Sequence, residues 1–258
     1  MNTEHKFNIA VLIDGDNAQA KLIKEVIEEA SKYGKATIRR IYGDWTSHHM
    51  NSWKSTINQH SISPIQKFSY TTGKNSTDSS MIIDAMDILH SDRIEGFCIV
   101  SSDSDYTGLA KRIREEGLFV MGIGEKKTPQ AFVKSCEVFT YTENLVQHLE
   151  EDVPEVERTK NSKSKATNTI QVTPKQKFVK LSKEDAATIN KAFQISLNDS
   201  EDEAHLSKVG ANIRKIDPGF DARAYGYSNL TKLFANLEKY TVLKNVVGGL
   251  NHPLVKMK

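Results

Sequence analysis

The feature that most constrains this chain is an alternation of short apolar runs with stretches whose apolar residues recur at helical spacing. The apolar runs lie near residues 7–13, 37–42, 62–68, 97–100, 118–122 and 138–141. The stretches with helical spacing lie near residues 18–33, 50–59, 78–90, 106–116 and 129–134. Strands that alternate with helices predict a parallel sheet joined by right-handed crossovers, with helices on its faces. In such a sheet, ligand chemistry lies at the carboxyl ends of the strands.

Acidic residues cluster at those predicted strand ends. They are Asp14 and Asp16 after the first run, Asp44 after the second, Asp78 and Asp84 in the helix after the third, and Asp103 and Asp105 after the fourth. An Asp at a helix start often caps the helix. Capping accounts for one Asp per helix, but not for two pairs that follow buried strands. Crowded carboxylates need protonation or a cation to relieve their repulsion, and such hard oxygen ligands favour Mg²⁺ or Mn²⁺.

Composition narrows the class of protein. The apolar share of 38% in 258 residues is near that of globular proteins and excludes wholesale disorder. No apolar stretch approaches the roughly 20 residues that a bilayer span needs, so we expect no membrane partner. Two cysteines are too few for a disulfide framework or a cysteine zinc site. These features predict a cytoplasmic protein.

A basic segment divides the chain. Residues 158–183 contain eight Lys or Arg residues and no acid, together with many Ser, Thr and Asn residues. Such a composition cannot bury enough apolar surface to offset its ordering entropy, which predicts a flexible linker over residues 148–183. The positive charge would also attract a polyanion without reading its sequence, although a simple solvated charge run fits the composition as well.

The segment after this linker, residues 184–258, has the pattern of a small winged helix. Apolar side chains recur at helical spacing near residues 184–197, 206–216 and 229–239. A Gly248-Gly249 turn between apolar pairs then predicts a short hairpin. Three helices followed by a hairpin predict a winged-helix-like domain, whose third helix usually presents its polar face to nucleic acid.

Three stretches of the first part resemble the signature blocks of NYN domains, PIN-like nuclease relatives that include the LabA-like bacterial proteins. These stretches are IDGDN (13–17), KNSTDSSMIIDAMD (74–87) and IVSSDSDY (99–106). The resemblance implies a PIN-like domain over residues 1–147, with a catalytic acidic site for RNA cleavage formed by Asp14, Asp78 and Asp103. It also implies that Asp84, Asp105 and Asn17 are accessory residues, and that Asp84 and Asp105 are further metal ligands. Asn75 and Ser102 stand where the family commonly has Gly, which affects loop geometry but removes no acid.

The second part, LSKVGANIRKIDPGFDARAYGYSNLTKLF (206–234), resembles the OST-HTH/LOTUS domain. The resemblance implies a module that binds RNA or a protein partner. Basic and amide side chains on and near the third helix are the candidate RNA contacts, namely Asn229, Lys232, Asn236 and Lys239, with Arg214, Lys215 and Arg223. In the first part, Lys74, Arg39 and Arg40 are candidate phosphate contacts, and Asn17 either contacts the scissile phosphate or orients Asp14.

The interpretation that joins these features is a ribonuclease dependent on Mg²⁺ or Mn²⁺, cutting RNA endonucleolytically, with an appended RNA-binding module. An RNA-binding adaptor with a weak or inactive acidic site is the alternative. Asp14-Gly-Asp16 also resembles the D-x-D nucleophile motif of haloacid-dehalogenase phosphatases, but Asn17 stands where that family has Thr or Val. Self-association of the chain is left open.

Overall fold

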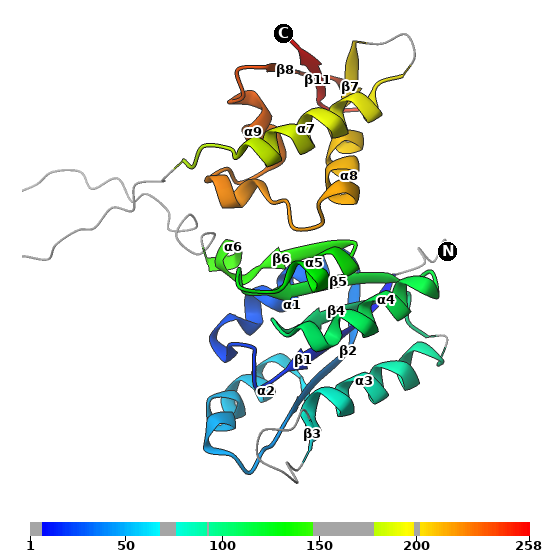
Figure 1. The fold of residues 1–258 in the computed structure, drawn as a ribbon, viewed down its shortest axis with the longest axis vertical. Coiled ribbons are helices and arrows are strands. Elements are labelled where there is room, and N and C mark those ends of the chain that lie inside the picture. Colours follow the sequence, from blue (N-terminus) through cyan, green and yellow to red (C-terminus); the bar gives the residue numbers. More distant parts are fainter. Residues whose placement is uncertain (1–6, 68–75, 92, 147–177, 199–201) are drawn as a thin grey trace, which may run out of the picture.

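The computed structural model describes residues 7–67, 76–91, 93–146, 178–198 and 202–258. Its first domain is built on a six-stranded parallel sheet in the order β3-β2-β1-β4-β5-β6 (Figure 1). The strands are β1 (Asn8–Asp14), β2 (Lys35–Gly43), β3 (Ser63–Gln66), β4 (Gly96–Val100), β5 (Phe119–Gly124) and β6 (Val138–Tyr141). The predicted α/β fold, a parallel sheet flanked by helices, is confirmed and fits a PIN-like domain.

Helices cover both faces of this sheet. They are η1 (Ala20–Leu22), α1 (Ile23–Ser31), η2 (His48–Trp53), α2 (Lys54–His60), α3 (Ser76–Leu89), η3 (Ser104–Tyr106), α4 (Thr107–Glu115), α5 (Gln130–Ser135) and α6 (Thr142–Val146). The α1, α2 and α6 side chains form one apolar core, and those of α3, α4 and α5 form the other. Strand β1 supplies both cores, with Ile9, Val11 and Ile13 on one face and Ala10 and Leu12 on the other. A strand buried on both faces explains its uninterrupted apolar run.

The second domain is a small winged-helix-like unit. Its elements are α7 (Lys183–Ser196), β7 (Glu203–His205), α8 (Leu206–Ile216), η5 (Ala222–Tyr225), α9 (Leu230–Ala235), β8 (Tyr240–Leu243), β9 (Val246–Val247), β10 (Leu250–Asn251) and β11 (Leu254–Met257). A separate core of helix and strand side chains, including Phe193, Val209 and Phe234, holds it together. Strands β7, β11 and β8 form an antiparallel sheet in that order.

The predicted Gly-Gly hairpin is present as β9 and β10. Val247 pairs with Leu250, so Gly248 and Gly249 alone form the turn. Both have positive φ, +60° and +82°, which is the geometry of a two-residue type I′ turn and favours glycine at both places.

Most of the predicted linker, residues 148–177, lies outside the described residues. Its last residues are described and pack on the second domain: the Phe178 ring lies 5.0 Å from the Tyr227 ring, centroid to centroid. Ser182 then caps α7 by accepting a 3.0 Å hydrogen bond from the Asp185 amide. Among the described helices, none is long and apolar enough to cross a membrane.

Candidate metal centre

Three carboxylates meet at the carboxyl end of the sheet. Asp103 and Asp105 follow β4, and Asp78 lies in the first turn of α3. One carboxylate oxygen from each of the three lies within 4.8 Å of the other two. Asp78 and Asp103 are partly buried and Asp105 is exposed. We call these three residues the acidic cluster.

Asp14 ends β1 and is completely buried. It accepts hydrogen bonds from the Asp16 amide at 3.2 Å, the Asn17 side-chain amide at 2.7 Å and the Ser101 hydroxyl at 2.8 Å. The Ser101 oxygen in turn accepts from the Asp103 amide at 3.1 Å. Ser101 therefore joins the buried carboxylate of Asp14 to the backbone of the acidic cluster.

Local turn geometry positions the other members. Asp103 caps η3 by accepting a 3.0 Å hydrogen bond from the Asp105 amide. The buried Tyr106, which ends η3, donates its hydroxyl to Asp78 Oδ1 at 2.8 Å. One short 3₁₀ turn thus fixes Asp103 and Asp105 and reaches across to α3.

Burial and like charge act together on these acids. Burial raises the pKa of Asp78 above its ordinary value, and the nearby Asp103, Asp105 and Asp16 raise it further, against the Tyr106 hydrogen bond. Burial also raises the pKa of Asp14, although the hydrogen bonds from Asn17 and Ser101 oppose this and the charge of Asp78 adds to it. A nearby cation would favour the ionised form of both acids.

A model of the NYN domain family matches residues 8–146, more than half of the chain. The chain belongs to the NYN domain family. A model of the OST-HTH/LOTUS domain matches residues 176–251, so a LOTUS domain follows the NYN domain. This confirms the architecture that the sequence motifs predict, a domain of a nuclease superfamily joined to a domain of an RNA-binding family.

Solved structures offer two distant likenesses. A Vibrio parahaemolyticus protein of unknown function is 18% identical with a TM-score of 0.45, over 54% of this chain and 94% of that one. An uncharacterized protein of Nitrosomonas europaea, solved by NMR, is 24% identical with a TM-score of 0.28, over 38% of this chain and 92% of that one. Neither likeness is close enough to inform function. The comparison with curated proteins found no match.

Of the predicted metal ligands of the NYN domain, Asp14 and Asp84 lie outside the acidic cluster. Asp84 is engaged by other partners. Its carboxylate forms an ion pair with Arg40 and accepts the Tyr42 hydroxyl. Hydrogen bonding to Asp84 and burial both raise the pKa of Tyr42, so the phenol stays protonated and donates. Asp84 therefore neutralises Arg40, and it is not a member of the acidic cluster.

The predicted phosphate contacts differ in their surroundings. Arg40 is engaged by Asp84, and Arg39 donates to the backbone oxygens of Ala36 at 3.2 Å and His60 at 3.0 Å. Both arginines therefore have structural partners within β2 and its neighbours. Asn17 orients Asp14, which is one of the two roles predicted for it. Lys74 lies outside the described residues.

In the LOTUS domain, the structure contradicts the prediction that Arg223 is an RNA contact. Its side chain is only 11% exposed and is bonded to Glu29 of the NYN domain. Arg214 is exposed and lines a cleft between the domains, together with Lys32, Tyr33 and Asn229. Lys232 lies in the first turns of α9, where its amide donates to the Asn229 cap at 2.9 Å.

Sequence reasoning missed two supporting residues, Ser101 and Tyr106. Ser101 is the first residue after β4, and a hydroxyl buried beside a buried carboxylate must find a partner. Tyr106 lies on the apolar face of its turn, so the sequence alone favours a packing role. Only the three-dimensional structure shows that its hydroxyl reaches α3.

Proposed function

We propose that the chain is a divalent-metal-dependent ribonuclease that hydrolyses RNA endonucleolytically, with Mg²⁺ or Mn²⁺ as its cofactor. The acidic cluster, with Asp14 buried beside it, is the observation that supports this proposal. The proposed division of labour places the nuclease in residues 1–147 and the RNA-holding module in residues 184–258, joined by residues 148–183. RNA is the preferred substrate because both domains belong to families associated with RNA.

The chemistry of the site fits a hard divalent cation. Carboxylate oxygens are the ligands that Mg²⁺ and Mn²⁺ prefer, and one from α3 and two from the turn after β4 lie within 4.8 Å of one another. Besides burial, repulsion from Asp103 and Asp105 raises the pKa of Asp78, which shows that negative charge is concentrated at this site. A bound cation would relieve the repulsion between these carboxylates, which supports a binding site beside the buried Asp14.

Each residue has a defined role in this proposal. Asp78 and Asp103 hold the cation, and Asp105 completes the site from its exposed position. Asp14 fixes Ser101 and Asn17, and through Ser101 it fixes the Asp103 backbone. Tyr106 orients Asp78 by donating its hydroxyl to one of the carboxylate oxygens. When bound, the cation activates water and neutralises charge on the phosphodiester during in-line displacement.

The proposal is tested with purified full-length protein and single-stranded RNA in Mn²⁺, Mg²⁺ or chelator. Cleavage should require the metal and should fall at least about 100-fold in Asp14→Asn, Asp78→Asn and Asp103→Asn, because each removes a charge from the site. Asp87→Asn is a matched control, since Asp87 is an exposed acid on the same helix as Asp78. Its activity should equal that of the wild type.

The outcomes also separate the two alternatives. Full RNA binding without any metal-dependent cleavage would favour the RNA-binding adaptor and refute the enzyme. Cleavage that survives in all three acid variants would place the activity in another site or in a contaminant. For the phosphatase alternative, Asp14 would have to present its carboxylate to a substrate, whereas it is wholly buried and accepts three hydrogen bonds.

A further inference from the structure

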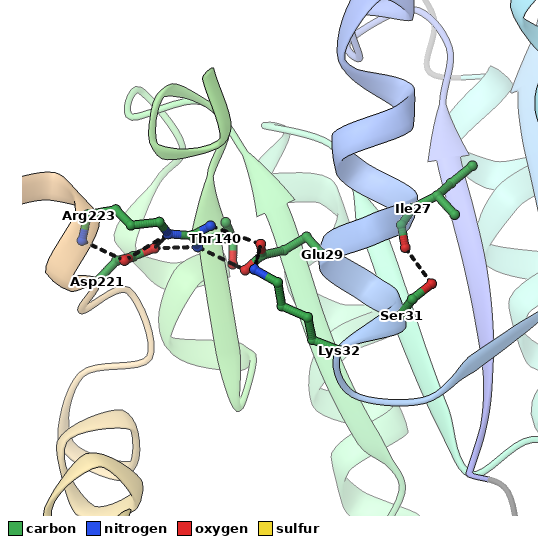
Figure 2. A network of polar contacts seen from close by, with 7 residues as sticks. All are labelled: Ile27, Glu29, Ser31, Lys32, Thr140, Asp221 and Arg223. Carbon is green, nitrogen blue, oxygen red and sulfur yellow. Dashed lines mark hydrogen bonds and ion pairs between the residues drawn. The ribbon is translucent and has the colours of Figure 1, made fainter. Parts of the chain in front are cut away.

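The two domains contact each other through a buried ion pair (Figure 2). Arg223 of the LOTUS domain donates from both terminal nitrogens to Glu29 of α1, at 2.9 Å to Oε2 and 2.8 Å to Oε1. The two side chains are 11% and 5% exposed. A bidentate pair of this kind fixes orientation as well as distance, because the planar guanidinium matches the carboxylate at two points.

Further groups complete the network on both sides. In the LOTUS domain, the remaining guanidinium nitrogen of Arg223 donates to Asp221 at 2.8 Å and 3.0 Å. In the NYN domain, Lys32 donates to Glu29 at 2.6 Å and the Thr140 hydroxyl donates at 3.3 Å. Two acids therefore face two bases, of which Arg223 is largely buried with both acids and Lys32 is exposed.

The Glu29 carboxyl is held in its ionised form. Burial alone would raise its pKa, but hydrogen bonds and attraction from Arg223 and Lys32 outweigh burial and hold the pKa below its ordinary value. The Arg223 guanidinium stays charged, because Asp221 and Glu29 raise its pKa against the effect of burial. Both partners are therefore charged at neutral pH, and each also has an oppositely charged neighbour in its own domain, Lys32 for Glu29 and Asp221 for Arg223.

A backbone contact lies beside the ion pair. Strand β6 is an edge of the NYN sheet, and edge strands carry unpaired amide and carbonyl groups. The Phe139 amide of β6 donates to the Pro218 carbonyl at 2.8 Å. Pro218 is buried, and next to it Gly219 packs so closely that a Cβ atom would lie 3.1 Å from the Tyr141 hydroxyl. The segment 217–223, which we call the docking loop, thus covers the sheet edge and places Arg223 against Glu29.

These contacts are specific to one arrangement of the domains. The bidentate pair between Glu29 and Arg223 has good geometry only when the planar guanidinium faces the carboxylate. A small rotation between the domains would separate Arg223 from Glu29 and Pro218 from Phe139 together. Intermediate placements that keep one contact and lose the other are therefore disfavoured.

We propose that the docking loop holds the LOTUS domain in one fixed orientation on the NYN domain, so that the full-length chain behaves as a single body. The surface recognised is α1 and the edge strand β6, and the partner is the LOTUS domain of the same chain. The basic linker between the two domains predicts that they move independently. The contacts between them indicate one defined orientation instead. In combination with the proposed function, RNA held by the LOTUS domain would meet the NYN domain from one direction.

Single-molecule energy transfer on the full-length protein tests this inference. Ser55 of the NYN domain and Lys244 of the LOTUS domain are exposed, so cysteines introduced there take donor and acceptor dyes. The native cysteines, Cys98 and Cys136, are buried and should not react. The wild type should give one narrow transfer efficiency, as expected of two domains in a fixed orientation.

Two neighbouring glutamates provide a matched pair of charge reversals. Glu29→Arg places two cations face to face in the docking contact, whereas Glu28→Arg makes the same charge change at an exposed position of the same helix. Glu29→Arg should broaden the transfer distribution and shift its mean, and Glu28→Arg should leave it as in the wild type. Gly219→Val perturbs the docking loop without changing α1, and it should also broaden the transfer distribution and shift its mean. It provides a second test if Glu29→Arg loses its NYN fold.

Three results would overturn the inference. The first is a broad distribution in the wild type. The second is a narrow, unshifted distribution in Glu29→Arg or Gly219→Val when circular dichroism shows both variants folded. The third is a dimeric mass by light scattering with transfer only between chains, which would assign the contact to a second copy. RNA cleavage is measured separately, so loss of the proposed function would not imitate any of these results.

Discussion

The sharpest consequence of the acidic cluster is that Asp78 should lower the stability of the metal-free protein. Like charges 4.8 Å apart, the largest separation within the cluster, repel by about 1 kcal/mol at a dielectric constant of about 80 and about 3.5 kcal/mol at about 20. Asp78 faces two such charges while half-buried, and salt screens part of the repulsion. We therefore expect Asp78→Asn to raise the free energy of unfolding by about 1–2 kcal/mol at neutral pH in chelator.

The substituted side chain can keep the existing hydrogen bond. The Asn carbonyl can accept from the Tyr106 hydroxyl as Asp78 Oδ1 does, and the amide group can donate to the neighbouring carboxylates. A change of about 1–2 kcal/mol corresponds to a rise of about 2–8 °C in Tm for a domain of this size. Differential scanning fluorimetry or chemical unfolding would resolve it.

Metal should reverse this order of stability. A ligand that binds only the folded state stabilises it by about 2.7 kcal/mol at 100 times its Kd, so saturating Mn²⁺ should raise the Tm of the wild type above that of Asp78→Asn. In chelator, acid should remove the difference in stability between Asp78→Asn and the wild type. The pKa of Asp78 is raised in the folded protein, so ionisation of Asp78 lowers the stability of the wild type at pH values above the unfolded pKa of 3.8. This loss of stability disappears as the pH falls towards 3.8. Asp87→Asn, the exposed control, should show neither effect.

Two results would refute this reasoning. If Asp78→Asn is less stable than the wild type in chelator, the repulsion between the carboxylates is smaller than the cost of the substitution. If Mn²⁺ raises the Tm of Asp78→Asn as much as that of the wild type, Asp78 is not a ligand.

Further predictions follow from single contacts. Ser101→Ala removes the hydroxyl that joins Asp14 to the Asp103 backbone, and it should cost about 1–3 kcal/mol in unfolding experiments because it leaves buried groups unsatisfied. Gly249→Ala forces a side chain into φ +82° and should lower the stability of the LOTUS domain by about 1–2 kcal/mol, whereas Gly108→Ala, which meets open space, should not. Domain docking should persist above pH 4.5 and weaken in energy-transfer measurements as the pH falls through the lowered pKa of Glu29, with Lys32, Arg223, Asp221 and Tyr33 as the charged or titratable groups nearby.

The sequence predicted the sheet and the positions of its acids because periodicity and strand order carry that information directly. Strands β1, β4 and β5 are buried on both faces, so their apolar runs are visible in the sequence, whereas the edge strand β3 is mostly exposed. Parallel strands then bring their carboxyl ends to one edge. The topology brings Asp78 of α3 to the turn that carries Asp103 and Asp105, even though Asp78 is distant from that turn in sequence.

Elements defined by their partners were not predictable in this way. Strand β7 (Glu203–His205) lies between the predicted helices near residues 184–197 and 206–216, and three residues are too few to show a strand pattern in the sequence. It becomes a strand by pairing with β11, with Ala204 opposite Val255. Asp84 and Arg223 are similar cases at the level of side chains. Their charges suggested a metal ligand and an RNA contact, but each is taken up by a partner of opposite charge more than 40 residues away.

The acidic cluster and the docking contact lie at different strands of the same sheet, so each can be tested without disturbing the other. Asp103 and Asp105 follow β4, whereas Thr140 and Phe139 lie on β6, two strand spacings away in the order β4-β5-β6. At about 4.8 Å per spacing the two strands are about 10 Å apart, and substitutions that far apart with no shared partner normally have additive effects. The described hydrogen bonds of Glu29 reach Lys32, Thr140 and Arg223, and those of Asp14 reach Asp16, Asn17 and Ser101, so the two sets share no residue. A cleavage defect in Asp78→Asn with unchanged energy transfer therefore identifies a fault in the metal site, and altered transfer with unchanged metal-dependent Tm in Glu29→Arg identifies a fault in docking.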